Sequence, residues 1–424
     1  RAFQAQHCAP AVCSPEPLSH SHYHNSITRH STVQQQLYRA VATTTRRQFH
    51  SRNYEKPKEK PFYKRISREM KFAVGVASAV AGYLIYNDYR SEQKRLSLAI
   101  VGTGDSPVLE TRPPDQKIAR SIHNPKDASG LKLTLYQYQT CPFCCKLRVF
   151  LDYYGFSYDV VEVNSVTRAQ TKWTEYKKVP FLVVEIPGTD YGESTILQLK
   201  DSSLIISVLS SALRNPGESL MNLLDSYPSR YNEENKLEFS NRFNVMYGDN
   251  PDALIHLYDI QEERVWRKWV DDVFVHVLSP NVYRTPTEAL QAFTWFSEVG
   301  EWEKLFPVWE RLLVIYFGAS VMWIIGKKLK RKYRLESDPR RSLYKEAKKW
   351  TNLIASARGT FAGGERPNLA DLSMYGVLMA IEGCDAFQDV MEENKKLLSW
   401  FTEMKIRVLR RDGEQILVKR CTIR

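Results

Sequence analysis

Three of the seven cysteines in this 424-residue chain lie together, at Cys141, Cys144 and Cys145. Cys141 and Cys144 enclose Pro142 and Phe143 in a Cys-Pro-x-Cys motif. A helix that begins after Cys141 would place exposed N–H groups and its positive dipole end beside the sulfur, which lowers the thiol pKa. Cys144 would lie one turn further along, where it could resolve a mixed disulfide. The motif predicts a reactive thiol at Cys141, whereas Cys145 points to another side of the helix and is expected to pack.

A zinc site is the other chemistry that two close cysteines support. Such a site takes four ligands, and the chain has no second Cys-x-x-Cys motif, because Cys384 and Cys421 are isolated. Six of the nine histidines fall within residues 1–54, but at irregular spacing. We therefore expect no metal site.

The residues around the motif predict a sheet domain. Residues 131–138 alternate between apolar and polar types, as in a half-buried strand, and residues 146–151 have an amphipathic helical pattern. Residues 158–164 predict a second strand, parallel to the first because a helix connects the two. A third strand at 179–184 begins with Pro180. This order of elements is that of a thioredoxin-like fold.

A peptide-binding position follows from that fold. The proline that opens the third strand is cis in thioredoxin-like folds and faces the cysteine pair, so the backbone of Val179 beside Pro180 can pair with an extended thiol peptide such as glutathione. Asp201 and Ser202 precede a predicted helix at 204–212, where they can hold a carboxylate or an amine. Helix capping alone would explain Asp201. Its combination with the cysteine pair favours a glutathione site.

The second half of the chain predicts a helical domain. Asn368 and Asp371 have the spacing of a capping box at the start of a helix. The apolar stretch 312–326 could be a membrane helix, but we expect a core helix because the stretch is short and lies among other helices. The basic residues that follow it are expected to form a solvent-exposed face.

The composition places most of the positive charge in two segments. The chain is 43% apolar and 12% aromatic, which indicates a globular protein with a sizeable core. Its net charge of +12 arises from residues 1–54, with +5, and residues 327–349, with +8. The remainder is near neutral, and no nucleic-acid-binding motif accompanies the charge, so nucleic-acid binding is not expected.

The N-terminal region predicts targeting and membrane attachment. Residues 1–54 are rich in Ser, Thr, His, Gln and Arg, which is typical of a mitochondrial transit peptide. Residues 72–86 form an unbroken apolar run flanked by charged residues. A single membrane helix is the favoured interpretation, and a buried helix is the alternative.

These motifs together resemble the membrane-associated prostaglandin E synthase type 2 family, in which a glutaredoxin-like domain is fused to a glutathione-transferase-like helical domain. The resemblance covers most of residues 131–390 and is most specific at 279–289 (SPNVYRTPTEA). The other matching segments are 133–144 (LTLYQYQTCPFC), 160–164, 178–180, 201–207, 367–371 and 375–378.

The resemblance implies a fold class of α/β plus all-α. The expected order is a targeting segment at 1–55, a membrane anchor helix at 66–90, a linker or arm at 91–130, a glutaredoxin-like domain at 131–213, a connector at 214–245, a helical domain like the C-terminal part of glutathione transferases at 246–410, and a tail at 411–424. A homodimer is expected from the fold.

The resemblance also implies the isomerisation of prostaglandin H2 to prostaglandin E2. Cys141 would be the reactive thiol, with Tyr138 and Phe143 lining the substrate pocket. The glutathione-binding residues would be Val179, Pro180, Asp201 and Ser202. Family members can also bind haem through the glutathione sulfur and then cleave prostaglandin H2 to malondialdehyde and a hydroxy fatty acid.

Two basic residues depart from the family pattern. Two arginines in the family connect to the cysteine thiol through hydrogen bonds, and Lys328 and Lys332 stand at those positions here. Lysine keeps the charge but lacks the planar fork of arginine. The resemblance therefore implies that Lys328 and Lys332 tune the Cys141 thiol through their charge.

Two other functions fit the same motifs. The first is a glutaredoxin-like thiol–disulfide oxidoreductase, which would need Cys144 as a second thiol, or a glutathione transferase. A non-enzymatic glutathione- or haem-binding membrane protein would not depend on Cys141. The expected location is a membrane, mitochondrial by composition, with the Golgi membrane or the cytoplasm after anchor removal as alternatives.

Overall fold

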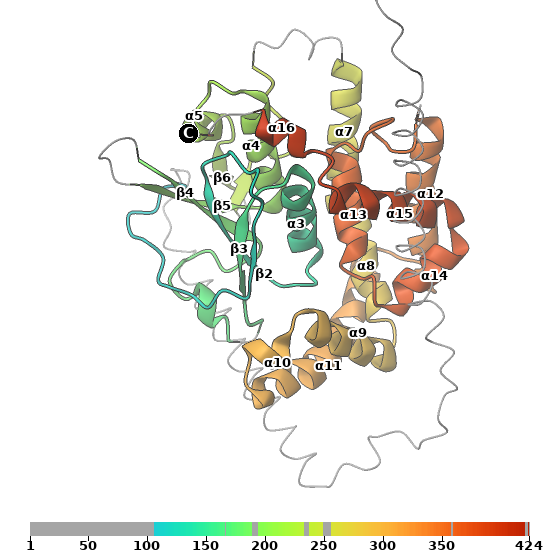
Figure 1. Ribbon diagram of the computed structural model, residues 1–424. Helices are drawn as coiled ribbons and strands as arrows, with labels where there is room; N and C mark the ends of the chain where they lie inside the picture. Colours follow the sequence, from blue (N-terminus) through green and yellow to red (C-terminus); the bar gives the residue numbers. More distant parts are fainter. Residues whose placement is uncertain are drawn as a thin grey trace, which may run out of the picture. The chain divides into compact units, whose positions relative to one another are not determined.

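The computed structural model describes residues 106–165, 167–188, 194–232, 237–248, 256–357, 359–419 and 423 (Figure 1). The predicted targeting segment at 1–55 and the predicted membrane helix at 66–90 lie outside the described residues. The described part contains one mixed five-stranded sheet, a two-stranded hairpin and a set of helices.

The five-stranded sheet has the order β1-β3-β2-β4-β5. Strand β2 pairs in parallel with β3 and antiparallel with β4, and β4 pairs antiparallel with β5. Buried side chains such as Leu135 and its neighbours Val160 and Leu182 hold the centre. The predicted strand–helix–strand unit is therefore confirmed. The strands are β1 (Arg120–Ile122), β2 (Lys132–Gln137), β3 (Tyr158–Glu162), β4 (Phe181–Ile186) and β5 (Thr195–Lys200).

Part of the predicted arm at 91–130 belongs to the sheet. Residues Arg120–Ile122 form β1, an antiparallel edge strand on β3. Further upstream, Val108 forms an isolated bridge with Leu197 on the other edge. A three-residue strand is too short to show an alternating pattern, so it could not be predicted from periodicity.

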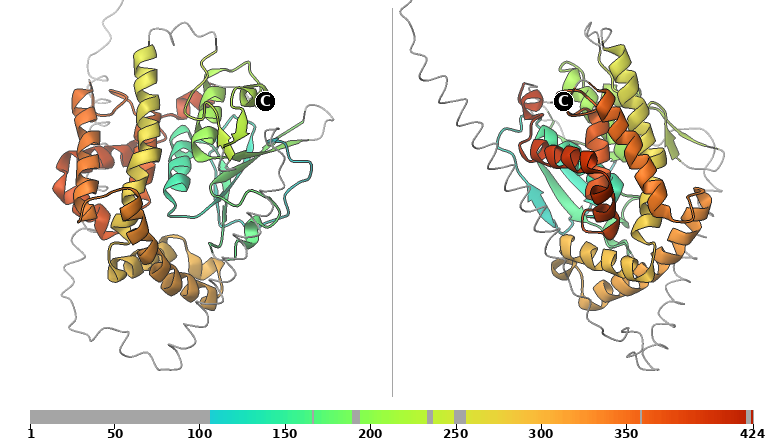
Figure 2. Two further views of the ribbon diagram at one scale, coloured as in Figure 1. Left: turned by 180° about the vertical axis from the view of Figure 1, so that it is seen from behind. Right: turned by 90° about the vertical axis from the view of Figure 1, so that its right-hand side faces the viewer.

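Two helices cover one face of the sheet and a third packs on them. Helix α3 (Pro142–Tyr154) contacts α4 (Ser202–Arg214) and α13 (Leu369–Met379). A Cβ atom on Gly376 would lie 2.5 Å from the Cα atom of Lys146, so the backbones of α13 and α3 meet directly. The helices coloured yellow to red lie on the side of the sheet that α3 covers (Figure 2).

The helical region has the capping box that the sequence predicts. The side chain of Asn368 accepts hydrogen bonds from the N–H groups of Ala370 and Asp371, while Asp371 accepts one from Asn368 N. Asp371 also accepts from Trp400 Nε1 at 3.0 Å. The helices are α7 (Leu257–Trp269), a π-helical turn η3 (Val270–Phe274), α8 (Val275–Val282), α9 (Pro286–Val299), α10 (Trp302–Leu305), α11 (Val308–Lys332), α12 (Pro339–Ser356), α13, α14 (Asp385–Glu393) and α15 (Lys395–Leu409).

The expected connector and tail both contain regular structure. The connector forms α5 (Leu220–Asp225) and a hairpin of β6 (Ser229–Tyr231) and β7 (Leu237–Phe239). The tail forms α16 (Glu414–Val418), which contacts α3. Gly413 N donates to Tyr153 O at 3.1 Å at this contact.

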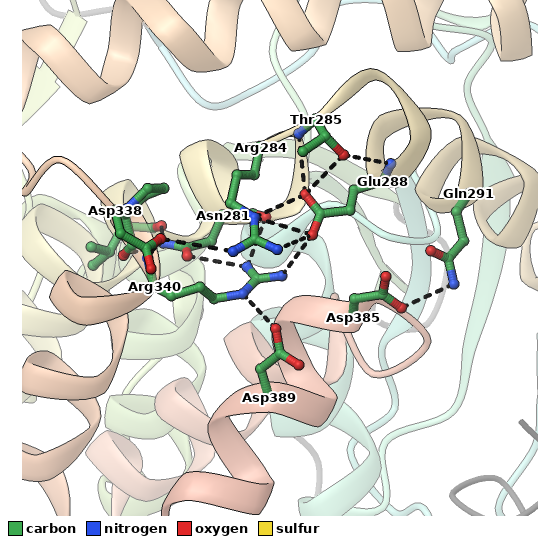
Figure 3. Close-up of polar contacts among 11 residues, drawn as sticks. Asn281, Arg284, Thr285, Glu288, Gln291, Asp338, Arg340, Asp385 and Asp389 are labelled. Carbon is green, nitrogen blue, oxygen red and sulfur yellow. Dashed lines mark hydrogen bonds and ion pairs between the residues drawn. The ribbon is translucent and has the colours of Figure 1, made fainter. Parts of the chain in front are cut away.

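The most specific sequence motif folds into a polar cluster at the turn between α8 and α9 (Figure 3). Thr285 and Glu288 form a capping box at the start of α9. The buried Arg340 donates to Asn281 O at 2.8 Å and to Asp389 Oδ2 at 2.7 Å, and pairs with Glu288 at 3.3 Å. The cluster joins α8, α9, α12 and α14, so this motif serves the fold.

The prediction of a core helix at 312–326 was wrong. Helix α11 spans 25 residues, of which only Val314, Ala319 and Gly326 are buried. One side packs on α8 and α9, and the other side is exposed because nothing among the described residues covers it. Within the described ranges, α11 is the one helix long and apolar enough to cross a membrane by length and composition.

Candidate active site

Cys141 stands at the N-cap position of α3, directly before Pro142. Its backbone is extended, with φ −73° and ψ 126°, so the helix begins at the next residue as predicted. The residue is partly exposed, while Cys144 one turn later is fully buried. This arrangement leaves Cys141 as the accessible thiol of the pair.

The two thiols differ in acidity for local reasons. The neighbouring Cys144 thiol lowers the pKa of Cys141 below its ordinary value, and the N–H groups of Cys144 and Phe143 act in the same direction. The charge of Arg148 adds to this effect. Burial raises the pKa of Cys144 well above its ordinary value. Cys141 is therefore the thiol of the pair that loses its proton more readily.

Arg148 lies beneath the active-site loop, and the sequence analysis did not single it out. Its guanidinium donates to Gln137 Oε1 at 2.6 Å, to Gln139 O at 2.9 Å and to Cys145 Sγ at 3.2 Å. Cys145 is buried as predicted, and burial raises its pKa to about 11. Because Gln139 precedes Cys141 by two residues, these bonds place a buried positive charge under the reactive loop.

A pocket of about 250 Å³ opens beside Phe143. Its walls bring together the predicted residues Phe143, Val179, Pro180, Asp201 and Ser202, which come from three separate segments of the chain. The Val179–Pro180 peptide bond is cis, as predicted. The remaining wall residues are Tyr176, Lys178, Arg242, Asp271, Asp272 and His276.

Cys141 and Tyr138 are not among the residues that line this pocket. Cys141 lies next to it in the chain, two residues before Phe143. Tyr138 packs against a buried cluster that includes Tyr136 and Phe181, and burial raises the pKa of its hydroxyl to about 12. Tyr138 therefore stays neutral and can serve as an apolar wall or form hydrogen bonds through its hydroxyl.

The carboxylate of Asp201 caps α4. One oxygen accepts from Ser203 N at 2.9 Å and Leu204 N at 3.1 Å, and the other accepts from Arg242 at 3.1 Å. The Arg242 side chain is about one-third exposed, at 34%. A ligand amine could replace this guanidinium, so capping and ligand binding are compatible at Asp201.

A buried ion pair lies behind the pocket, and the sequence analysis missed it. Lys146 Nζ lies 2.6 and 2.8 Å from the carboxylate oxygens of Asp271 and 2.7 Å from Ser203 Oγ. The Ser203 hydroxyl donates to Asp271 Oδ2 at 2.6 Å. The three residues join α3, α4 and η3, and so connect the reactive helix, the capped helix and the helical region.

The π-helical turn η3 brings two acidic residues to the pocket. Asp271 and Asp272 fall in this turn, and His276 follows in α8. The His276 ring stacks on Tyr333 with 4.3 Å between centroids. Single-turn π segments are common at functional sites. No periodicity in the sequence marked this turn.

Lys328 and Lys332 lie at the C-terminal end of α11 and are exposed. Burial lowers the pKa of the His276 imidazole, and the nearby charge of Lys332 lowers it further. In the part of the chain that the structure describes, neither lysine hydrogen-bonds to Cys141. Arg148 is the described basic residue that acts on the Cys141 thiol.

Comparison with known proteins agrees with this geometry. A family model for the N-terminal domain of glutathione S-transferases matches residues 135–217, which hold β2 to β5 and α3 to α4. Prostaglandin E synthase 2 of Danio rerio is 43% identical over 65% of this chain and 71% of its own length. The protein of that name from Mus musculus is 41% identical over 69% of this chain and 75% of its own length. The chain belongs to the prostaglandin E synthase 2 family.

Among solved structures, glutathione transferase F7 from Populus trichocarpa aligns with 66% of this chain and 99% of its own, at 12% identity and a TM-score of 0.36. That score is too low to add to the assignment. Family membership rests on the two curated relatives, both of which are named as enzymes. The sequence motifs from 133 to 390 identified this family correctly.

Proposed function

We propose that this protein isomerises prostaglandin H2 to prostaglandin E2, with Cys141 as the reactive thiolate and glutathione as the bound thiol. The relatives named prostaglandin E synthase 2 supply the substrate class. One structural observation carries the proposal: an accessible thiol of lowered pKa at the start of α3, next to a pocket that collects the predicted glutathione residues.

The chemistry needs a nucleophile that returns unchanged. The Cys141 thiolate attacks the endoperoxide oxygen on C9 and forms an S–O bond, while the O–O bond breaks and the oxygen on C11 takes up a proton. Loss of the C9 hydrogen as a proton then forms the C9 carbonyl as the S–O bond breaks and the thiolate leaves. The proton lost at C9 balances the one gained at C11, so the sequence is a true isomerisation.

Glutathione binding would use the pocket walls. The backbone of Val179 offers an edge that can pair with the peptide, and the cap carboxylate of Asp201 offers an acceptor for its amine. Ser202 is the first residue of α4, where the positive end of the helix dipole favours a carboxylate. Phe143, two residues after Cys141 in the chain, supplies an apolar wall of this site.

The test is product formation by the purified full chain with prostaglandin H2 and glutathione. We expect prostaglandin E2 above the no-enzyme rate, lost in Cys141→Ser and kept in Cys144→Ser. If the wild type forms no prostaglandin E2 above the no-enzyme rate but reduces a glutathione mixed disulfide, and both variants lose this reduction, the protein is a thiol–disulfide oxidoreductase. If neither product forms while glutathione still binds Cys141→Ser, the non-enzymatic alternative holds.

Haem binding and release of malondialdehyde remain predictions from the family resemblance. The pocket of about 250 Å³ is below the range of about 300–1,000 Å³ typical of small-molecule sites. His276, the pocket histidine, has its ring stacked on Tyr333. The described residues do not form a built haem site, so no step here passes through haem. Titration with haemin and glutathione, followed by the Soret band and by malondialdehyde release, tests the prediction.

A further inference from the structure

Helix α11 carries an apolar face that no described residue covers. Trp309, Leu312, Tyr316 and Ile324 are 63%, 43%, 49% and 50% exposed. Their spacing of three, four and eight residues keeps them on one side of a helix. The same side continues into Lys327 and Arg331. These six residues are called the outer face of α11.

The opposite side of α11 fixes the helix to the protein. Gly318 lies against the ring of Phe293 on α9, and Gly326 lies against Tyr283. Near its first turn, Glu310 accepts a hydrogen bond from Asn164 Nδ2 at 2.6 Å. These contacts hold α11 against α8 and α9 along one side. Its outer face can only contact something that lies along it.

The chemistry of the outer face matches a lipid surface. Tryptophan and tyrosine favour the boundary between headgroups and acyl chains, and the stems of lysine and arginine can lie on apolar surface with their charges in water. Lys327 Nζ already lies 3.8 Å above the ring of Trp323. Five of the six residues from Lys327 to Lys332 are basic. Such a cluster attracts anionic headgroups and repels its own copy in a parallel pair.

We propose that the outer face of α11 binds the surface of an anionic membrane, with the helix parallel to the bilayer. This contact is separate from the predicted helix at 66–90 and depends on no part of the proposed reaction. It would also place the pocket near the lipid. Tyr333, directly after α11, stacks on the pocket residue His276.

The test is hydroxyl-radical footprinting of the full chain, read by mass spectrometry at single residues. With vesicles of phosphatidylcholine and phosphatidylserine, we expect oxidation of Trp309 and Tyr316 to fall at least threefold. Tyr258 on α7, which is 76% exposed, is the control and should not change. Vesicles of phosphatidylcholine alone should protect Trp309 and Tyr316 much less.

Charge variants test the electrostatic part of the proposal. The triple variant K327Q/K330Q/R331Q should raise the vesicle concentration for half-maximal protection by about tenfold or more, because each basic residue near an anionic surface contributes to binding. The variant R341Q/K348Q/K349Q removes the same charge from α12 and should leave that concentration nearly unchanged.

Four results would overturn the proposal. Vesicles that leave Trp309 and Tyr316 unprotected show that the face does not meet lipid. Protection without vesicles that grows with protein concentration assigns the face to a second copy of the chain. Protection without vesicles that is the same at every protein concentration assigns the face to another segment of the same chain. Equal protection by both kinds of vesicle removes the role of the basic cluster.

Discussion

Substitution of Lys146 by methionine tests the connection between the reactive helix and the rest of the protein. The Lys146 and Asp271 side chains are 1% and 8% exposed, and their charged atoms are 2.6 Å apart. Methionine has nearly the same length, but among the described residues it leaves the Asp271 carboxylate with the Ser203 hydroxyl as its one hydrogen-bond donor. Removing one partner of a buried pair costs about 3–5 kcal/mol. Because Asp271 also lines the pocket, water can reach it, and we expect a loss near the lower end, about 3 kcal/mol.

Urea denaturation followed by circular dichroism measures this loss. The double variant K146M/D271N removes both charges and should recover most of the stability. Lys349→Met is the matched control, since Lys349 pairs with Glu346 at 2.8 Å but is 56% exposed, and it should lose less than about 1 kcal/mol.

The K146M variant should also weaken glutathione binding. Ser203 is the second residue of α4, so loss of its bond to Lys146 loosens the helix start that Asp201 caps. Calorimetric titration of the folded K146M variant with glutathione measures the effect. The reasoning fails if K146M unfolds within 1 kcal/mol of the wild type, on the order of the exposed pair, or if the double variant is no more stable than the single one.

Three further predictions follow from particular contacts. Arg148→Met should raise the midpoint pH for alkylation of Cys141, because it removes a buried positive charge that favours the thiolate, and K328Q/K332Q should shift that midpoint less; an equal shift in both would contradict this. Gly376→Val should destabilise the protein by more than about 3 kcal/mol in thermal unfolding, because its Cβ would lie 2.5 Å from Lys146 Cα. Gly217→Ala has open space and serves as its control. Asp371→Ala should cost about 3–5 kcal/mol, since Asp371 accepts from Ala362, Gly363, Asn368 and Trp400; a Tm within 3 °C of the wild type, roughly the shift from 1 kcal/mol, would argue against it.

Local signals made the reactive helix and the capping box predictable. The Cys-Pro-x-Cys motif marks a helix start because proline suits the first turn, and Asn368 with Asp371 marks another because the two side chains bond each other's backbone. Each of these two helix starts is marked by residues that lie within four consecutive positions of the sequence. Their positions in the structure agree with the expectation.

Contacts between distant segments could not be predicted in the same way. Lys146 and Asp271 are 125 residues apart, and a lone lysine on a helix normally indicates a solvent-exposed face. Arg148 gave no signal for the same reason. Helix α11 was misread as a core helix because the apolar stretch 312–326 is short and lies among other helices, but neighbours in the sequence do not say what covers each side of a helix.

The central claim is that the Cys141 thiolate performs the chemistry. Its most direct test is the pH dependence of kcat/KM for prostaglandin H2, measured beside the pH dependence of Cys141 alkylation in the wild type and in Cys144→Ala. Loss of the Cys144 thiol removes the group that most lowers the pKa of Cys141, so both midpoints should rise together. If the alkylation midpoint rises while the profile of kcat/KM stays where it was, the thiolate of Cys141 is not the group that reacts.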